Sequence, residues 1–440
     1  MRTTLHLRFP GIRKVLLKHF SRIPDHRDRE KIGHELKDVC MGALAMFCYQ
    51  DPSLLQFQKR TQAPLLAANL KNLWAIDSVP SDTQMRTVMD EIDSREFESL
   101  FTVFFRLLQR GKHLEQYRVL RKYYLCAVDG SEYFSSDHIG CPSCLRRKVK
   151  KKLGDTLQFS HQIVQAALVH PRLSPVIPLP PEAVKNTDGC EKQDCETNAA
   201  KRLLGKIRKA HPKLPLIIVA DSLYSKQPMI DAIASADMHY VLTAKPDDHK
   251  MLMEWVNEMR LLHDVMHMEY EDPKGRTHVY EWINAVPLNG NKNSPLVNFF
   301  EYWLKDGQRI GYHSSWVTDL SLDDECIEEM VRIARSRWMI ENEVFNTVKN
   351  HGYHIEHNYG HGLRNLSFNF FLLNMIAFFL HQIFELTDRT YQWLRKNLGS
   401  KKNLGSKKNL WDHMRILCYS IVFADWEDLL LRIVHDSGYS

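Results

Sequence analysis

The sequence lacks three features that would place the protein outside the cytosol or in a membrane. No signal peptide opens the chain, and its nine cysteines follow no regular framework of the kind found in disulfide-rich secreted domains. The most apolar segment, 368–384, is interrupted by Asn369, Asn374 and His381, and it falls short of a comfortable membrane span. We therefore expect a reducing cytosolic compartment, no membrane role, and a buried core helix at 368–384.

Net charge is also small, at +6 over 440 residues, but the cations are unevenly distributed. Residues 1–30 hold eight lysines and arginines against three acids, and 146–152 (RRKVKKK) has six cations in seven positions. A further basic run, KKNLGSKK, lies near the C-terminus. Basic islands on a near-neutral chain indicate a polyanionic partner, although a solvated lysine-rich surface is a frequent alternative.

The chain is long enough for two or three domains, and 44% hydrophobic with 25% charged residues is typical of a globular protein. Apolar residues at helical spacing, with a helix cap at Ser81, predict an N-terminal helical domain over 1–120. Short β-prone runs alternating with amphipathic helices predict the first part of an α/β core over 121–247. Alternation with turn signals predicts a mostly β insertion over 248–310.

The remaining sequence predicts a return to this core and then a C-terminal extension. Residues 311–390 contain a core strand, one continuous helix from about Asp323 through Lys349, and the apolar helix. Residues 391–440 combine a polar linker, in which KNLGSK recurs at 396–401 and 402–407, with a final helical piece.

The part of that helix at 335–349 (RSRWMIENEVFNTVK) carries a buried-acid signal. At about 100° per residue, one face of the helix gathers five apolar residues, which are Met330, Ile333, Ile340, Val344 and Val348. Glu341 lies near the centre of this face with Arg337 one turn before it, whereas Glu343 points toward water and Trp338 is expected to pack in the core. A carboxylate on an apolar face costs several kcal/mol unless a cation compensates it, so either an ion pair with Arg337 or a metal ion is expected.

Two further acids stand at the ends of predicted buried strands. Asp129 follows LCAV and Asp221 follows IIVA, and side chains at such strand ends face the crevice where ligands bind. Either aspartate alone is as well explained by a turn or a helix cap. Together with Glu341 they would form three converging carboxylates, which repel one another unless hard cations such as Mg²⁺ or Mn²⁺ lie between them. Two such ions, roughly 3.5–4 Å apart, activate a water or hydroxyl and stabilise the leaving oxygen of a phosphodiester.

Three segments in order then carry a family resemblance, AVDGSEYF, IIVADSLYS and RWMIENEVFNTVKN, followed by GYHIEHNYGHG. The set resembles the DDE transposases of bacterial insertion sequences over roughly 75–385. It is similar to the group with a β insertion before the catalytic Glu and a Tyr-x2-Arg-x3-Glu-x6-Lys signature. Arg337 and Glu341 fit this signature, but Ala334 stands at the Tyr position and Lys349 comes one place late. These departures admit Glu343 as a rival third acid.

The resemblance implies an α/β fold, with a ribonuclease-H-like catalytic core interrupted by a mostly β insertion, an N-terminal helical domain and C-terminal helices. It implies an endonuclease that performs cut-and-paste transposition, in which Asp129, Asp221 and Glu341 hold two Mg²⁺ (or Mn²⁺) ions and Arg337 and Lys349 contact DNA. The implied partners are double-stranded terminal inverted repeats, target DNA and a second copy of the chain, in the bacterial cytoplasm at the nucleoid. A ribonuclease-H-like nuclease without strand transfer and a catalytically decayed DNA-binding protein are the alternatives.

A single CxxC motif gives a weaker signal, for a structural Zn²⁺ ion. Its candidate ligands are His138, Cys141, Cys144 and His161, with Cys190 and Cys195 as alternatives. Four more histidines follow the catalytic helix, at His351, His354, His357 and His361. Their spacing is loose for a metal site, so we expect them to contact phosphate or to pack within turns.

Overall fold

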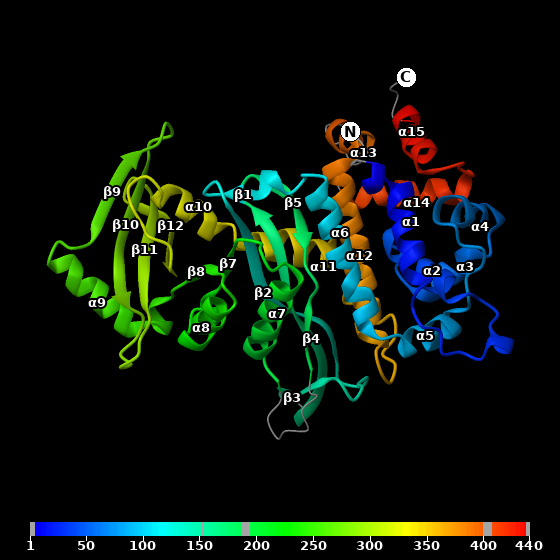
Figure 1. Ribbon diagram of the computed structural model, residues 1–440, viewed down its shortest axis with the longest axis horizontal. Coiled ribbons are helices and arrows are strands. Elements are labelled where there is room, and N and C mark those ends of the chain that lie inside the picture. Colours follow the sequence, from blue (N-terminus) through cyan, green and yellow to red (C-terminus); the bar gives the residue numbers. More distant parts are fainter. Residues whose placement is uncertain (1–4, 152–153, 186–193, 399–406, 437–440) are drawn as a thin grey trace.

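The computed structural model describes residues 5–151, 154–185, 194–398 and 407–436. The fold is mixed α/β, with a large mixed sheet at one side and most of the helices gathered at the other (Figure 1). The chain crosses between these two parts twice, because residues 5–110 and the described residues of 366–436 lie in the helical part.

The helical part begins with six helices whose apolar residues recur at helical spacing. They are α1 (Phe9–Phe20), α2 (Leu36–Cys48), α3 (Leu54–Thr61), α4 (Pro64–Asn69), α5 (Asp82–Glu91) and α6 (Ser94–Arg110). The predicted cap at Ser81 is confirmed, because its side chain accepts the Gln84 backbone N–H and so satisfies one of the free donors at the start of α5. Residues 9–110 thus form a helical unit before the first strand.

The apolar segment is the long helix α12 (Leu366–Thr387), which packs against α2, α5, α6 and the sheet. It is long and apolar enough to cross a membrane, but 89% of its apolar window is buried inside the fold. The side chain of Asn369, one of its polar interruptions, donates to the carbonyls of Met89 and Ile92 at 2.8 Å each. The prediction of a buried core helix is therefore confirmed.

Three helices follow, namely α13 (Arg389–Leu398), α14 (Lys407–Ser420) and α15 (Trp426–Asp436). The predicted single final helical piece is thus two helices. Most of the repeated KNLGSK, at 399–406, lies outside the described residues, so the predicted linker stays a prediction.

The order of the sheet is β3-β4-β2-β7-β8-β12-β11-β10-β9, with β5 and β6 also paired to β4. Its strands are β1 (Arg118–Val119), which pairs with β2, and then β2 (Tyr123–Ser136), β3 (Leu145–Lys151), β4 (Gly154–His170), β5 (Leu173–Pro178), β6 (Glu182–Val184), β7 (Leu216–Ala220), β8 (His239–Thr243), β9 (Met266–Glu271), β10 (Arg276–Pro287), β11 (Leu296–Asp306) and β12 (Arg309–Thr318). The strands β5, β4 and β2 are antiparallel, whereas β2, β7 and β8 are parallel and are connected through α7 (Glu196–Ala210) and α8 (Gln227–Ser235). This order is consistent with a ribonuclease-H-like fold.

Residues 248–310, predicted as a mostly β insertion, begin with α9 (Lys250–Leu261) and continue as β9, β10 and β11. These strands and β12 form an antiparallel meander, which joins the central strands where Trp316–Thr318 of β12 pair with β8. The meander is therefore part of the same sheet rather than a separate one.

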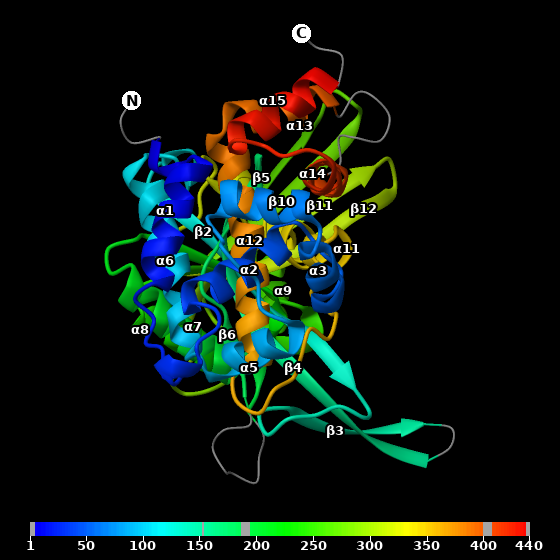
Figure 2. The same cartoon turned by 90° about the vertical axis from the view of Figure 1, so that its right-hand side faces the viewer.

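A hairpin that the sequence did not predict projects from the central strands. The basic run at 146–152 was predicted to bind a polyanionic partner or to form a solvated surface, without a secondary structure; its described residues, 146–151, lie in β3, which pairs with the first part of β4. We call this hairpin, residues 145–151 and 154–160, the basic arm. It extends away from the rest of the molecule (Figure 2), and its exposed cations include Arg146, Arg147, Lys148 and Lys150.

Candidate active site

The register of two parallel strands brings Asp129 and Asp221 together. Ala127 on β2 pairs with Val219 on β7, so two residues further along each strand Asp129 stands opposite Asp221. Neighbouring strands lie about 4.8 Å apart, and paired residues point to the same face of the sheet. Asp221 follows β7 directly, and its carboxylate accepts the Leu223 N–H at 2.9 Å. The two acids therefore lie side by side, Asp221 at the end of β7 and Asp129 within β2. The sequence predicted that a strand ends at Asp129, but β2 continues to Ser136.

The third acid, Glu341, is linked to Asp129 by the side chain of Arg337. The helical turn that carries Glu341, η7 (Ile340–Asn346), packs against β2. The Arg337 guanidinium lies 2.5 Å from the Glu341 carboxylate and 3.9 Å from the Asp129 carboxylate. One cation thus bridges an acid on β2 and an acid on η7.

The electrostatics of Asp129 report the same convergence. Burial and then the negative charge of Asp221 raise the pKa of Asp129 to about 7. The Gly130 N–H and the Arg337 guanidinium lower this pKa, and the Glu341 carboxylate raises it slightly. The charges of both other acids therefore act on Asp129. Arg337 alone does not offset the effect of burial on the pKa of Asp129.

The predicted continuous helix from Asp323 to Lys349 is wrong in one respect that matters here. The segment consists of α10 (Ile327–Arg335), a turn, the π-helical η7 and α11 (Thr347–Asn350). A π-helix bonds i to i+5, so its residues advance by a smaller angle than those of an α-helix. The five apolar residues are buried as predicted, but the side chain of Glu341 is 48% exposed rather than central to the buried face. Trp338, predicted to pack in the core, is 47% exposed.

A fourth carboxyl, Glu196, lies beside the pair of aspartates, and sequence reasoning missed it. Glu196 is the first residue of α7 and accepts the Tyr224 hydroxyl at 2.7 Å. Burial raises the pKa of Glu196, the Tyr224 hydroxyl lowers it, and the charge of Asp221 raises it further. A Cβ placed on Gly130 would lie 2.3 Å from the Glu196 carboxylate, so the residue after Asp129 has to be glycine unless Glu196 moves. An acid at a helix start is common, so the sequence carried no signal for this one.

Arg337 lies beside the acids, whereas Lys349 forms its ion pair with a different residue. Lys349 lies in α11, and its ammonium is paired with Glu356 at 2.9 Å. The predicted contacts of Arg337 and Lys349 with DNA stay predictions. Glu343, the rival third acid, was predicted to point toward water but is partly buried, whereas Glu341 is exposed; the ion pair that Arg337 shares with Asp129 runs to Glu341.

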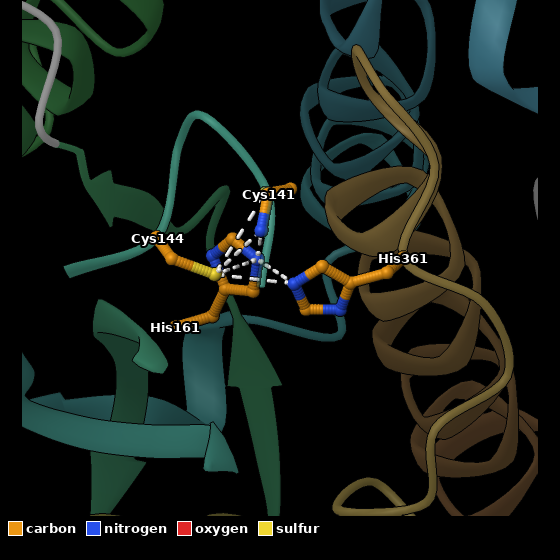
Figure 3. Close-up of side chains that lie close together, drawn as sticks. All are labelled: Cys141, Cys144, His161 and His361. Carbon is orange, nitrogen blue, oxygen red and sulfur yellow. Dashed lines mark hydrogen bonds between the residues drawn. The ribbon is translucent and has the colours of Figure 1, made fainter. Parts of the chain in front are cut away.

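The predicted cysteine motif lies away from these acids. Its cysteines meet His161 and His361 instead of the expected His161 and His138. Cys141, Cys144 and His161 come together, and His361 joins them (Figure 3). The prediction of His138 as a ligand is wrong, because this residue is exposed in the turn after β2, where its backbone N–H is bonded to a serine hydroxyl.

The other candidate ligands do not join this cluster. Cys195 is exposed, with its sulfur 3.2 Å from the Thr197 hydroxyl, and Cys190 lies outside the described residues. His361 was expected to contact phosphate or pack in a turn with its three neighbouring histidines, but it alone among them reaches the cysteines. The sequence did not indicate His361 as a ligand, because about 200 residues separate it from the cysteine motif.

Two family models match the chain. A DDE_Tnp_1-associated model matches residues 17–105, which lie within the helical unit, and a transposase DDE domain model matches residues 191–379. The second match contains Asp221 and Glu341, and the strand that carries Asp129 lies between the two matches. No curated protein matches the chain significantly. The two family models describe DDE-type transposases, and the acids that β2 and β7 bring together are consistent with that family. The chain belongs to the DDE-type transposases.

Proposed function

We propose that the protein cuts DNA at the ends of an insertion sequence and joins the freed 3′ ends to target DNA, in cut-and-paste transposition. The proposal rests on one observation above all. The parallel register of β2 and β7 sets Asp129 beside Asp221, and Arg337 links Asp129 to Glu341. We assign Asp129, Asp221 and Glu341 as the catalytic acids and the ligands of two Mg²⁺ or Mn²⁺ ions.

The residues present suit such ions. The donors are carboxylate oxygens, which hard divalent cations prefer, and burial together with a neighbouring carboxylate makes the ionised form of Asp129 unfavourable without more positive charge. When bound, the ions would activate the attacking oxygen and stabilise the leaving oxygen of the phosphodiester.

The protein's own residues then hold these acids in place. Arg337 neutralises part of the negative charge, and in the DNA complex we expect it and Lys349 to contact phosphates. Glu341 is favoured over Glu343 as the third acid because Glu341 is the one bridged to Asp129. Glu196 and Tyr224 act as positioning residues, because Tyr224 holds the Glu196 carboxylate by a hydrogen bond and that carboxylate lies against the backbone at Gly130.

The proposed DNA partners are the terminal inverted repeats and the target duplex, bound by a dimer of the chain in the bacterial cytoplasm at the nucleoid. The basic arm supports a DNA partner, because its exposed cations project away from the core, where a duplex can approach. The strand order supports a ribonuclease-H-like core with β9, β10 and β11 as its β insertion.

The test compares Asp221→Asn with Asp231→Asn, an exposed aspartate on α8 that serves as the matched control. Asp221→Asn is expected to abolish Mg²⁺-dependent cleavage of end DNA while binding in a gel-shift assay stays near wild type. Asp231→Asn is expected to retain both. Equal loss of binding and cleavage in Asp221→Asn would contradict the assignment.

The products of the wild-type reaction separate the remaining functions. Joined end–target products support transposition, whereas cleavage without joining, given a target duplex, supports a ribonuclease-H-like nuclease. Binding without any cleavage in Mg²⁺ or Mn²⁺ would identify a decayed DNA-binding protein.

A further inference from the structure

The Cys141, Cys144, His161 and His361 side chains meet at one point from three distant segments. The cysteines lie in the turn before β3, His161 lies within β4, and His361 lies in the loop before α12 (Figure 3). The two sulfurs are 3.8 Å apart, and the two Nε2 atoms are 3.2 Å apart. The Nε2 of His161 lies 3.5 Å from each sulfur, and the Nε2 of His361 lies 3.1 Å from the sulfur of Cys144.

Most of these separations are close to those of a tetrahedral zinc site. Zinc binds sulfur at about 2.3 Å and imidazole nitrogen at about 2.0–2.1 Å. Tetrahedral angles then set about 3.8 Å between two sulfurs, about 3.6 Å between sulfur and nitrogen, and about 3.3 Å between two nitrogens. The sulfur pair, the nitrogen pair and both distances from the His161 Nε2 to the sulfurs match these values, whereas the His361 Nε2 lies closer to the Cys144 sulfur than the tetrahedron sets. All four ligand atoms lie within 4.8 Å of one another.

Other chemistry explains the cluster less well. The sulfurs are too far apart for a disulfide, which needs about 2.05 Å, and both cysteines are free. The donor set has no oxygen, so Mg²⁺, Mn²⁺ and Ca²⁺ are poor guests, while thiolate and imidazole together suit zinc. Four protein ligands would close the tetrahedron, as in a structural rather than a catalytic site.

The surroundings hold the ligands in these positions. Tyr133 stacks on His161 at 5.5 Å between ring centroids, and Phe134 packs on His361 at 4.4 Å. Gly360 and Gly362, with φ of +147° and +62°, flank His361, and these backbone angles favour glycine. The four backbone N–H groups that follow, at 363–366, all donate to the carboxylate of Asp90 on α5.

We propose that the chain binds a structural zinc ion through Cys141, Cys144, His161 and His361, which clamps the base of the basic arm to the loop before α12. Cys144 is adjacent to β3, and His161 directly follows the arm on β4. His361 belongs to the loop that Asp90 anchors to the helical unit. Zinc would therefore fix the direction of the arm relative to that unit.

The test measures metal in the purified full-length chain without DNA or Mg²⁺, so it does not depend on transposase activity. Chain purified under reducing conditions is expected to hold one zinc ion, measured by plasma mass spectrometry. After exchange, Co²⁺ is expected to show the visible bands of tetrahedral coordination and a near-ultraviolet thiolate charge-transfer band.

His361→Ala and His138→Ala form a matched pair of variants. His361→Ala is expected to weaken zinc affinity by more than about tenfold, because even changes outside the first ligand shell cost about 10–100-fold. His138→Ala is expected to bind zinc like the wild type. Cys141→Ser, with Cys195→Ser as its control, repeats the comparison if His361→Ala does not fold by circular dichroism.

The arm itself gives a second measurement. Chelation of the zinc is expected to speed tryptic cleavage within 145–151, because the clamp at the base of the hairpin is lost. A chain without stoichiometric metal after expression in zinc-supplemented medium would overturn the site. Zinc affinity that is unchanged in His361→Ala, or lost in His138→Ala, would also overturn the site, and an unchanged cleavage rate would overturn the clamp.

Discussion

Replacing Asp129 by asparagine is expected to change how the stability of the metal-free protein depends on pH. Burial and the Asp221 charge raise the pKa of Asp129 to about 7, against about 3.9 for an exposed aspartate. Between these values the folded chain binds more protons than the unfolded chain, so the free energy of unfolding falls as pH rises. The loss grows from about pH 4 to about pH 7 and is complete above that.

The size of the effect follows from the shift. About three pH units at about 1.4 kcal/mol each give a loss on the order of 4 kcal/mol. Asparagine carries no charge, and its side-chain oxygen still accepts the Gly130 N–H that bonds to Asp129 at 2.9 Å. Asp129→Asn should therefore match the wild type near pH 4 and exceed its stability near pH 8.

The assay is urea denaturation in EDTA from pH 4 to pH 8, and Glu132→Gln, a carboxyl-to-amide change on the same strand, is the control. Glu132→Gln is expected to keep the wild-type pH dependence. Adding Mg²⁺ at pH 8 should stabilise the wild type much more than Asp129→Asn, because the variant lacks a charged ligand. The reasoning is refuted if the difference in unfolding free energy between wild type and Asp129→Asn is the same at every pH.

Three further predictions concern the third acid, the backbone beside the site and the basic arm. Glu341→Gln should reduce Mg²⁺-dependent cleavage at least about a hundredfold while Glu343→Gln stays within about tenfold, and the reverse order in a cleavage assay would make Glu343 the third acid. Gly130→Ala should destabilise the chain by about 1–3 kcal/mol in urea, and Glu196→Ala should recover part of this loss by removing the overlapping carboxylate; no recovery would contradict the overlap. Lys148→Ala should reduce the slope of log affinity against log salt by about 0.9 in DNA titrations, and an unchanged slope would show that this cation does not contact DNA.

Much of this protein was predictable because its signals are local. The apolar run before Asp221 was visible as a short strand, the run before Asp129 was visible as the first half of β2, and the cap at Ser81 was visible as a residue type before a helix. The core helix α12 was predictable because interrupted apolar runs of that length are typical of buried helices. The family was predictable because three acidic segments occur in the right order.

The sequence by itself determined most of the strands and helices and pointed to the acids that we assign to the chemistry, because periodicity and capping act within a few residues. It did not reveal the hairpin of the basic arm or the break between α10 and η7. Only the tertiary structure decided which residues meet. The strand register placed Asp129 beside Asp221. The π-helical turn η7 left Glu341 exposed, although α-helical periodicity predicted that it is buried. Packing of the loop before α12 brought His361, not His138, to the cysteines. These outcomes depend on contacts between segments far apart in the chain, and no local pattern encodes the register, twist and packing that create them.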